Sequence, residues 1–288
     1  MLTQEFIRPV LHSRTLRGVA GLALVVGLYA ILAVWKENSP YSEVGDIPSE
    51  VHTSLTMVLG FLLVFRTNAA YSRWWEARTL WGGLVNASRN LTIKISTLPR
   101  SPRDEVEATG QLIAAFPKVL KNHLRSEAPD DLAPWLVEEL HRVQHAPGFL
   151  VSMLYTRLSH WKQQGWIDGD ELRVIDRELA RLLDICGGCE RILRTRIVRS
   201  YRTFARQCVL IFLLTLPWGI VNTFQWWTIP LTAITAYFML GMEIVAEHVE
   251  EPFGYDDDDL DLDGLCHTIE ASVTELLSST RLSNTTTT

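Results

Sequence analysis

Four apolar runs, two near each end of the chain, dominate the pattern of hydrophobic and polar positions. They cover residues 19–35, 51–65, 208–227 and 229–245. A helix rises about 1.5 Å per residue, so runs of this length approach or reach the roughly 30 Å thickness of a hydrocarbon core. The pattern predicts four membrane-spanning helices, the last two of which are joined by a minimal turn.

The long middle of the chain is charged and has helical periodicity. Apolar residues recur at three- and four-residue spacing, for example in the series Leu80, Leu84, Ala87 and Leu91, which is typical of amphipathic helices. Prolines at 99–102 and 129–134 predict breaks, and no segment alternates convincingly at the two-residue period of a strand.

We therefore expect an all-α fold with four parts. These are residues 1–65 with the first two spans, residues 66–207 as a cytoplasmic helical domain, residues 208–246 with the last two spans, and residues 247–288 as a cytoplasmic acidic and C-terminal segment.

Basic residues gather on one side of the predicted spans. Arginines precede the first run, follow the second and precede the third, whereas residues 37–50 contain four acids and no Lys or Arg. We therefore expect a multi-pass protein of the cell membrane. By the positive-inside rule, both termini and the middle domain lie in the cytoplasm. The net charge of −6 argues against a nucleic-acid partner.

The second apolar run begins with polar residues that a lipid-facing helix would not carry. Thr53, Met57, Phe61 and Phe65 follow at four-residue spacing and share one helical face. Taken alone, this stripe either packs against the first helix, which is the ordinary arrangement, or lines a pore.

The chain offers little for enzyme chemistry, since it has no Gly-rich phosphate loop and no Ser nucleophile elbow. His141 and His145 are four residues apart but lack a carboxylate ligand at a set spacing, so we expect surface histidines. Cys186 and Cys189 have the spacing of half a zinc or redox site, yet no second pair exists. We expect reduced thiols where a helix loosens, no enzyme activity and no required cofactor.

Two motifs carry a family resemblance. The first is Phe-Arg-Thr-Asn-Ala-Ala-Tyr-Ser-Arg-Trp-Trp-Glu-Ala-Arg at 65–78, and the second is Pro-Phe-Gly at 252–254 followed by the acids at 256–259. Tryptophans beside arginines suit the boundary between hydrocarbon and water. In their order and separation, and with four predicted spans, the motifs resemble those of bestrophins. The resemblance implies a homopentameric ion channel whose second helix surrounds a central pore.

The resemblance also implies where ions are constricted. Met57, Phe61 and Phe65 match the three apolar side chains of the pore neck, although Met57 departs from the usual Ile or Phe. Ile175 is the candidate for a second, cytoplasmic aperture. Its alternative is an ordinary place in the core of the helical domain.

The acidic segment has three interpretations. In animal bestrophins such a box holds Ca²⁺, and the matching ligands here are Glu251, Asp256 and Asp259, with backbone carbonyls near Arg8. Alternatively, the acids pair with nearby arginines as a structural charge clamp, or they form a solvated acidic face. The clamp is the reading we favour.

Ion selectivity follows from the outer loop. Glu43, Asp46 and Glu50 would line an outer vestibule and concentrate cations. We therefore expect monovalent cations to be preferred, and membrane lipid and further copies of the chain as partners. The alternatives are a chloride-selective channel of the same fold and a membrane scaffold that conducts no ions.

Overall fold

The computed structural model describes residues 14–40, 42, 47–128, 132–256 and 258–285. Within these ranges the chain is helical and contains no strand, which confirms the predicted all-α class. The residues divide into two compact units, each described here by itself. Unit 1 comprises residues 1–74, 196–252 and 256–258, and unit 2 comprises residues 75–195, 253–255 and 259–288.

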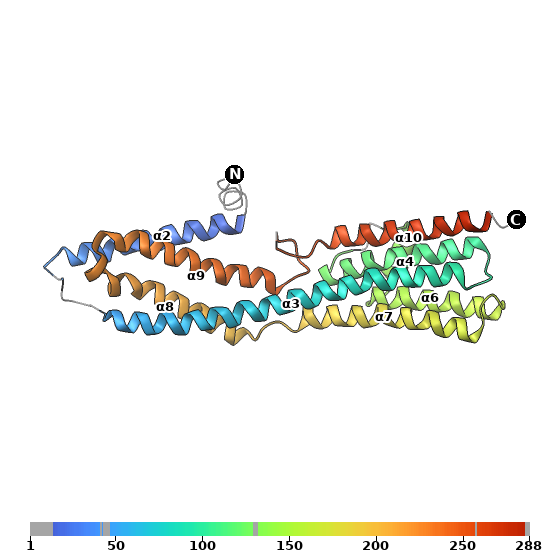
Figure 1. The fold of residues 1–288 in the computed structure, drawn as a ribbon, viewed down its shortest axis with the longest axis horizontal. Helices are drawn as coiled ribbons and strands as arrows, with labels where there is room; N and C mark the ends of the chain where they lie inside the picture. Colours follow the sequence, from blue (N-terminus) through green and yellow to red (C-terminus); the bar gives the residue numbers. More distant parts are fainter. Residues whose placement is uncertain (1–13, 41, 43–46, 129–131, 257, 286–288) are drawn as a thin grey trace. The chain divides into compact units, whose positions relative to one another are not determined.

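Unit 1 is built from apolar helices. They are α2 (Arg14–Glu37), the first part of α3 (Ser49–Thr97), α8 (Arg199–Phe224) and α9 (Thr228–Glu250). A 3-10 turn, η1 (Gln225–Trp227), joins α8 to α9, and α2 and α9 lie side by side (Figure 1). Among the described residues, three stretches are long and apolar enough to cross a membrane, and the third of them contains both α8 and α9. The four-span layout itself stays a prediction.

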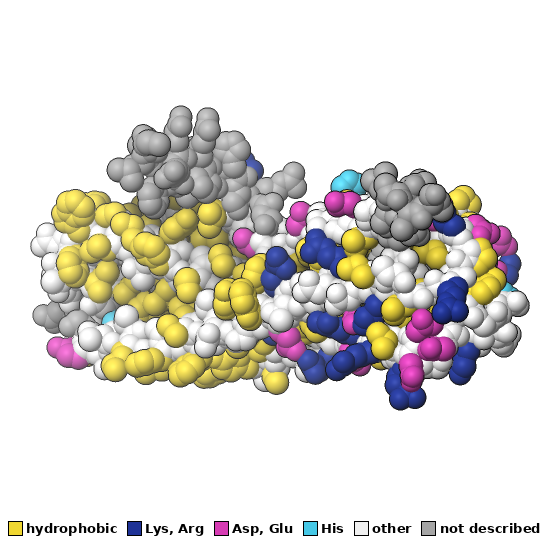
Figure 2. All heavy atoms as spheres, turned by 45° about the vertical axis from the view of Figure 1, so that its right-hand side comes forward, with side chains coloured by type: hydrophobic (Ala, Val, Ile, Leu, Met, Phe, Trp, Pro, Cys, Tyr) yellow, Lys and Arg dark blue, Asp and Glu magenta, His cyan; other side chains and the backbone are white. Residues whose placement is uncertain are grey.

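The surface of unit 1 carries many hydrophobic side chains, which gather over its helices in Figure 2. Leu28 and Trp35 on α2 and Leu210 on α8 are more than half exposed, as is Phe238 on α9. Helices that expose side chains of this kind on several faces suit an apolar surrounding better than water.

Close packing of α2 on α9 depends on Gly27. A Cβ added at Gly27 would lie 2.8 Å from the Cβ of Ala233. Replacing Gly27 by Val should therefore force the two helices apart and lower the free energy of unfolding by about 1–3 kcal/mol. Thermal unfolding in detergent measures this, and Gly21→Val is the matched control, since a Cβ there meets nothing within 4 Å. Equal loss in both variants would contradict the prediction.

Unit 2 is a bundle of amphipathic helices. Besides the rest of α3 it contains α4 (Arg103–Arg125), α5 (Pro134–Leu140), α6 (Ala146–Gln163), α7 (Gly169–Arg194) and α10 (Leu262–Thr285). Helix α4 packs against α6, α7 and α10 (Figure 1). The core is apolar and includes the fully buried side chains of Trp81, Phe116 and Trp161. The predicted proline breaks are confirmed, because α3 ends at Thr97 and α5 begins at Pro134.

The compact units do not coincide with the membrane and cytoplasmic parts expected from the sequence, and those parts stay a prediction. Unit 2 begins at Trp75 and its first segment ends at Thr195, where we expected a domain of residues 66–207. The reason is that α3 continues unbroken to Thr97, while Arg66 and Arg73 near its middle contact α9 within unit 1.

The expected loosening of the helix at Cys186 and Cys189 is wrong. Both thiols are free and buried inside α7, which runs without a break through Gly187 and Gly188. A Cβ at Gly188 would lie 2.9 Å from Leu80, so this glycine serves close packing. Burial, with the nearby charge of Glu190, raises the pKa of the Cys186 thiol to about 12, so it stays protonated and unreactive at neutral pH.

Candidate functional site

Helix α3 has two opposite faces within unit 1. Leu59, Leu63 and Arg66 are buried against the other helices, whereas the side chains of Met57, Phe61 and Phe65 are exposed. At about 100° per residue, the exposed stripe is centred roughly 180° away from the buried face. The stripe side chains are 65%, 56% and 66% exposed. The structure therefore excludes the ordinary arrangement, in which this stripe packs against the first helix of the same chain.

The polar start of α3 is accommodated inside one subunit. His52 is buried, and its Nε2 lies 3.2 Å from the hydroxyl of Thr215 on α8. Gly219 leaves room for the imidazole, because a Cβ there would lie 2.3 Å from His52 Nδ1. The hydroxyls of Ser54 and Thr56 donate to backbone carbonyls one turn earlier. These groups therefore find hydrogen-bond partners within one subunit, and the case for assembly rests on the apolar stripe.

A buried ionic network fixes the end of the stripe to α9. Arg66 is 0% exposed, and its Nε donates to Glu243 Oε2 at 2.7 Å. Arg206 on α8 donates to the other oxygen of Glu243 at 3.1 Å. Glu243 therefore pairs with one of the arginines that precede the third apolar run. Arg66 Nη1 also lies 3.8 Å from Glu250, whose carboxylate accepts a hydrogen bond from the backbone N–H of Ile197 at 3.0 Å.

Sequence reasoning missed the role of Arg66 in this network. A signal was present, because Leu59, Leu63, Arg66 and Ala70 recur at three- and four-residue spacing. An arginine on the same face as buried aliphatic residues needs a buried partner. The network holds α3, α8 and α9 together at the point where the neck side chains end.

The acidic segment makes structural contacts within unit 1. Glu251 pairs with Arg196 at 2.8 Å, as the charge-clamp interpretation predicts for this residue. Both side chains are about half exposed, so the pair contributes at most about 1 kcal/mol. The backbone carbonyl of Asp258 accepts a hydrogen bond from Trp74 Nε1 at 3.1 Å, which ties the second motif to the first.

The predicted calcium ligands are divided between the two units. Glu251 and Asp256 belong to unit 1 and are exposed, whereas Asp259 belongs to unit 2 and is half-buried. Among the described residues, these three are not part of a group whose ligand atoms converge on one point. Arg8, whose neighbouring carbonyls were expected to help, lies outside the described residues. Calcium binding stays a prediction.

The outer vestibule is described only in part. Glu50 is exposed at the start of α3, while Glu43 and Asp46 lie outside the described residues. The stretch predicted to form the neck carries no Asp, Glu, Lys or Arg between Val51 and Phe65.

The assignment of Ile175 to a cytoplasmic aperture is wrong. Its side chain is 0% exposed in the core of unit 2 and cannot face an ion path. The periodicity of α7 showed an amphipathic helix without showing which apolar position faces outwards. The neighbouring Val174 is 46% exposed and is the apolar side chain that this turn presents to its surroundings.

Apolar helices long enough to cross a membrane, with an exposed aromatic stripe and joined to a helical bundle, are features of an integral membrane protein. The chain matches the family model described as bacterial/fungal bestrophin protein over residues 5–275. It belongs to the bestrophin family.

Named relatives and solved structures agree with this assignment. The chain is 34% identical over 242 residues to a voltage-dependent anion channel-forming protein of Synechocystis, covering 81% of this chain and 78% of that protein. It is 34% identical over 244 residues to a protein of the same name from Ralstonia nicotianae, covering 80% of each. A crystal structure of a bacterial bestrophin homologue from Klebsiella pneumoniae has a TM-score of 0.84 at 26% identity, over 89% of this chain and 97% of that one.

These names bear on two of our expectations. They describe channel-forming proteins, which supports the prediction that the chain is not an enzyme. They also refer to anions, and so give no support to the cation preference that we predicted from the outer acids.

Proposed function

We propose that this chain forms a homopentameric ion channel of the cell membrane in which five α3 helices surround an apolar neck. The observation that carries the proposal is the exposed stripe of Met57, Phe61 and Phe65, opposite the buried face of α3. Placed around a common axis, the stripes bury one another and form three stacked apolar rings. Narrow apolar rings exclude water until they widen, and so control the passage of ions.

The topology and the wider ion path belong to the same proposal. Four spans place both termini and unit 2 in the cytoplasm, where the five copies of unit 2 enclose a vestibule. On α7, Val174 takes the place that we first gave to Ile175 as the apolar side chain of a lower aperture, because it is the exposed one of the two.

Oligomeric mass tests the assembly directly. Native mass measurement in detergent should give five chains per particle. A monomer or dimer as the sole species would end the pentamer proposal. Reconstitution into a planar bilayer should give discrete single-channel steps, whereas silence at all voltages would favour the membrane scaffold.

We propose anions as the permeant class. Support comes from the names of the relatives at 34% identity and from the aromatic rings of the neck, whose partly positive edges attract anions. A second candidate is a channel for monovalent cations. It is supported by exposed Glu50 and by the acidic composition of residues 37–50.

Reversal potentials separate the two candidates. In asymmetric NaCl, the current should reverse near the chloride equilibrium potential if anions permeate. Glu50→Gln should then leave the reversal potential almost unchanged, because the neck, and not the outer loop, discriminates between anions and cations. Reversal near the sodium potential, moved towards zero by Glu50→Gln, would establish the cation channel instead.

A further inference from the structure

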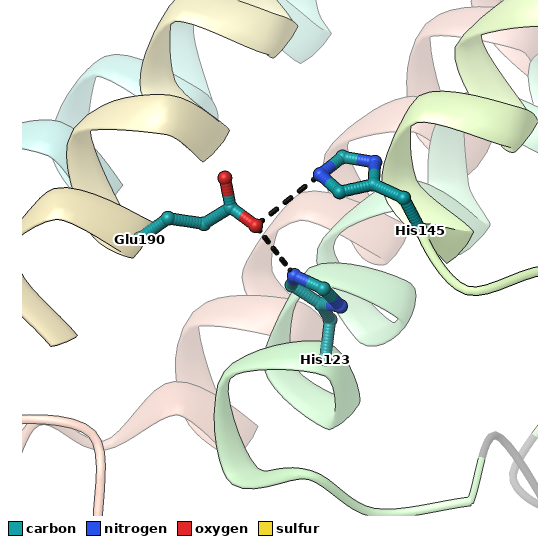
Figure 3. Close-up of side chains that lie close together, drawn as sticks. All are labelled: His123, His145 and Glu190. Atoms are coloured by element: carbon teal, nitrogen blue, oxygen red, sulfur yellow. Dashed lines mark hydrogen bonds and ion pairs between the residues drawn. The ribbon is translucent and has the colours of Figure 1, made fainter. Parts of the chain in front are cut away.

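Unit 2 contains a side-chain cluster that the channel proposal does not use. His123 lies in the last turn of α4, His145 is the N-cap of α6, and Glu190 lies near the C-terminal end of α7. The three side chains point towards one another from these separate elements (Figure 3). Their ligand atoms all lie within 4.8 Å of one another. Among the described residues, these three side chains are the group that is arranged closely enough to hold a metal ion.

The geometry points to a binding site for one divalent transition-metal ion of the zinc type, held by His123, His145 and Glu190. Two imidazoles and one carboxylate are a ligand set that Zn²⁺ uses, with a water molecule as the fourth ligand. The proposed channel function, which rests on the exposed stripe of α3 and on the relatives, does not depend on this site.

Two of the three distances between the ligand atoms can be compared with those of a tetrahedral site. Glu190 Oε1 lies 2.7 Å from His123 Nε2 and 3.2 Å from His145 Nε2. A tetrahedral ion with bonds of about 2.0–2.1 Å separates its ligand atoms by about 3.3–3.4 Å. Small rotations of the His123 and Glu190 side chains therefore open the space that an ion needs, without movement of the helices.

Partial burial holds two of the ligands in place, since the side chains of His123 and Glu190 are 18% and 19% exposed. Access is open as well, because the His145 side chain is about half exposed.

Two features oppose binding. The guanidinium of Arg194 lies 3.7 Å from Glu190 Oε1, but its side chain is mostly exposed and can turn away. His145 Nδ1 accepts a hydrogen bond from the Gly148 N–H at 3.0 Å. A metal at Nε2 moves the remaining ring proton to Nδ1, so this bond is lost on binding, which costs on the order of fivefold in affinity. The three bonds from the metal to His123, His145 and Glu190 contribute more binding free energy than this cost removes.

The test uses the full-length, untagged protein in detergent, freed of metal by dialysis against a chelator. Titration with ZnCl₂ against a coloured competitor chelator should give one zinc ion per chain. His123→Gln, His145→Gln and Glu190→Gln should each lower the affinity by at least about tenfold. His141→Gln is the matched control, since His141 is an exposed histidine four residues before His145.

A spectroscopic readout distinguishes this site from adventitious zinc. Co²⁺ added in place of zinc should give the intense visible absorption of a four-coordinate ion, and each ligand variant should lose it. Circular dichroism of the metal-free variants shows whether they fold, and the half-exposed His145 gives the substitution that disturbs the fold least. No saturable zinc uptake, or uptake that the three ligand variants leave unchanged, would overturn the proposal.

Discussion

Replacing Arg66 by Met is expected to lower the free energy of unfolding by about 3–5 kcal/mol, or to prevent assembly altogether. Arg66 is fully buried and contacts Glu243 at 2.7 Å and Glu250 at 3.8 Å. Methionine fills much of the same volume but leaves both carboxylates short of a positive charge in the interior. Thermal unfolding followed by size-exclusion chromatography in detergent measures the loss.

Two further variants make this result specific to buried charge. Arg199→Met removes an exposed arginine at the start of α8 and should change stability by no more than about 0.5 kcal/mol. Arg66→Met combined with Glu250→Gln should recover part of the loss, because neutralising the fully buried Glu250 carboxylate removes much of the penalty. If Arg66→Met alone unfolds at the temperature of the unchanged protein, the network does not hold the helices together.

The fold was predictable because its determinants are local in the sequence. Apolar runs of membrane length and three- to four-residue periodicity both act within one helix, and the prolines at 99–102 separate α3 from α4, although Pro117 and Pro217 lie inside helices. Helices α8 and α9 are indeed joined by a three-residue turn, Gln225–Trp227.

The faces of the helices were harder to predict, because they depend on the partner that each helix meets. Ile175 and Val174 are adjacent and both aliphatic, yet one is fully buried and the other is 46% exposed. The polar start of α3 was misinterpreted for the same reason. His52 is one of the polar residues that we judged unsuited to a lipid-facing helix, but Thr215 on α8 supplies a hydrogen-bond partner for it inside the subunit.

The cluster in unit 2 shows the limit of reasoning from spacing. His145 was treated as a surface histidine because no carboxylate stood at a suitable distance along the chain. Glu190 follows it by 45 residues, and His123 precedes it by 22. The packing of α4, α6 and α7 brings the three together, and no periodicity within a single helix reports contacts of this kind.

The largest expected effect on function is at the neck. Phe61 and Phe65 expose more than half of their side-chain area on the face of α3 that points away from its own subunit. In the proposed pentamer, each position contributes a ring of five benzyl groups. Truncation to Ala removes the aromatic ring and leaves a wider constriction that water wets more easily, so ions pass at lower cost.

Phe61→Ala and Phe65→Ala should each raise the unitary conductance or the open probability several-fold, measured from single channels in planar bilayers. Phe238→Ala is the matched control. It truncates a similarly exposed phenylalanine, 64% exposed, on α9, and should leave both quantities unchanged because α9 does not line the proposed pore. Each variant must first elute at the mass of the unchanged oligomer. Normal assembly with unaltered currents in both neck variants would show that the stripe faces lipid, and the ion path would then have to be sought on another helix.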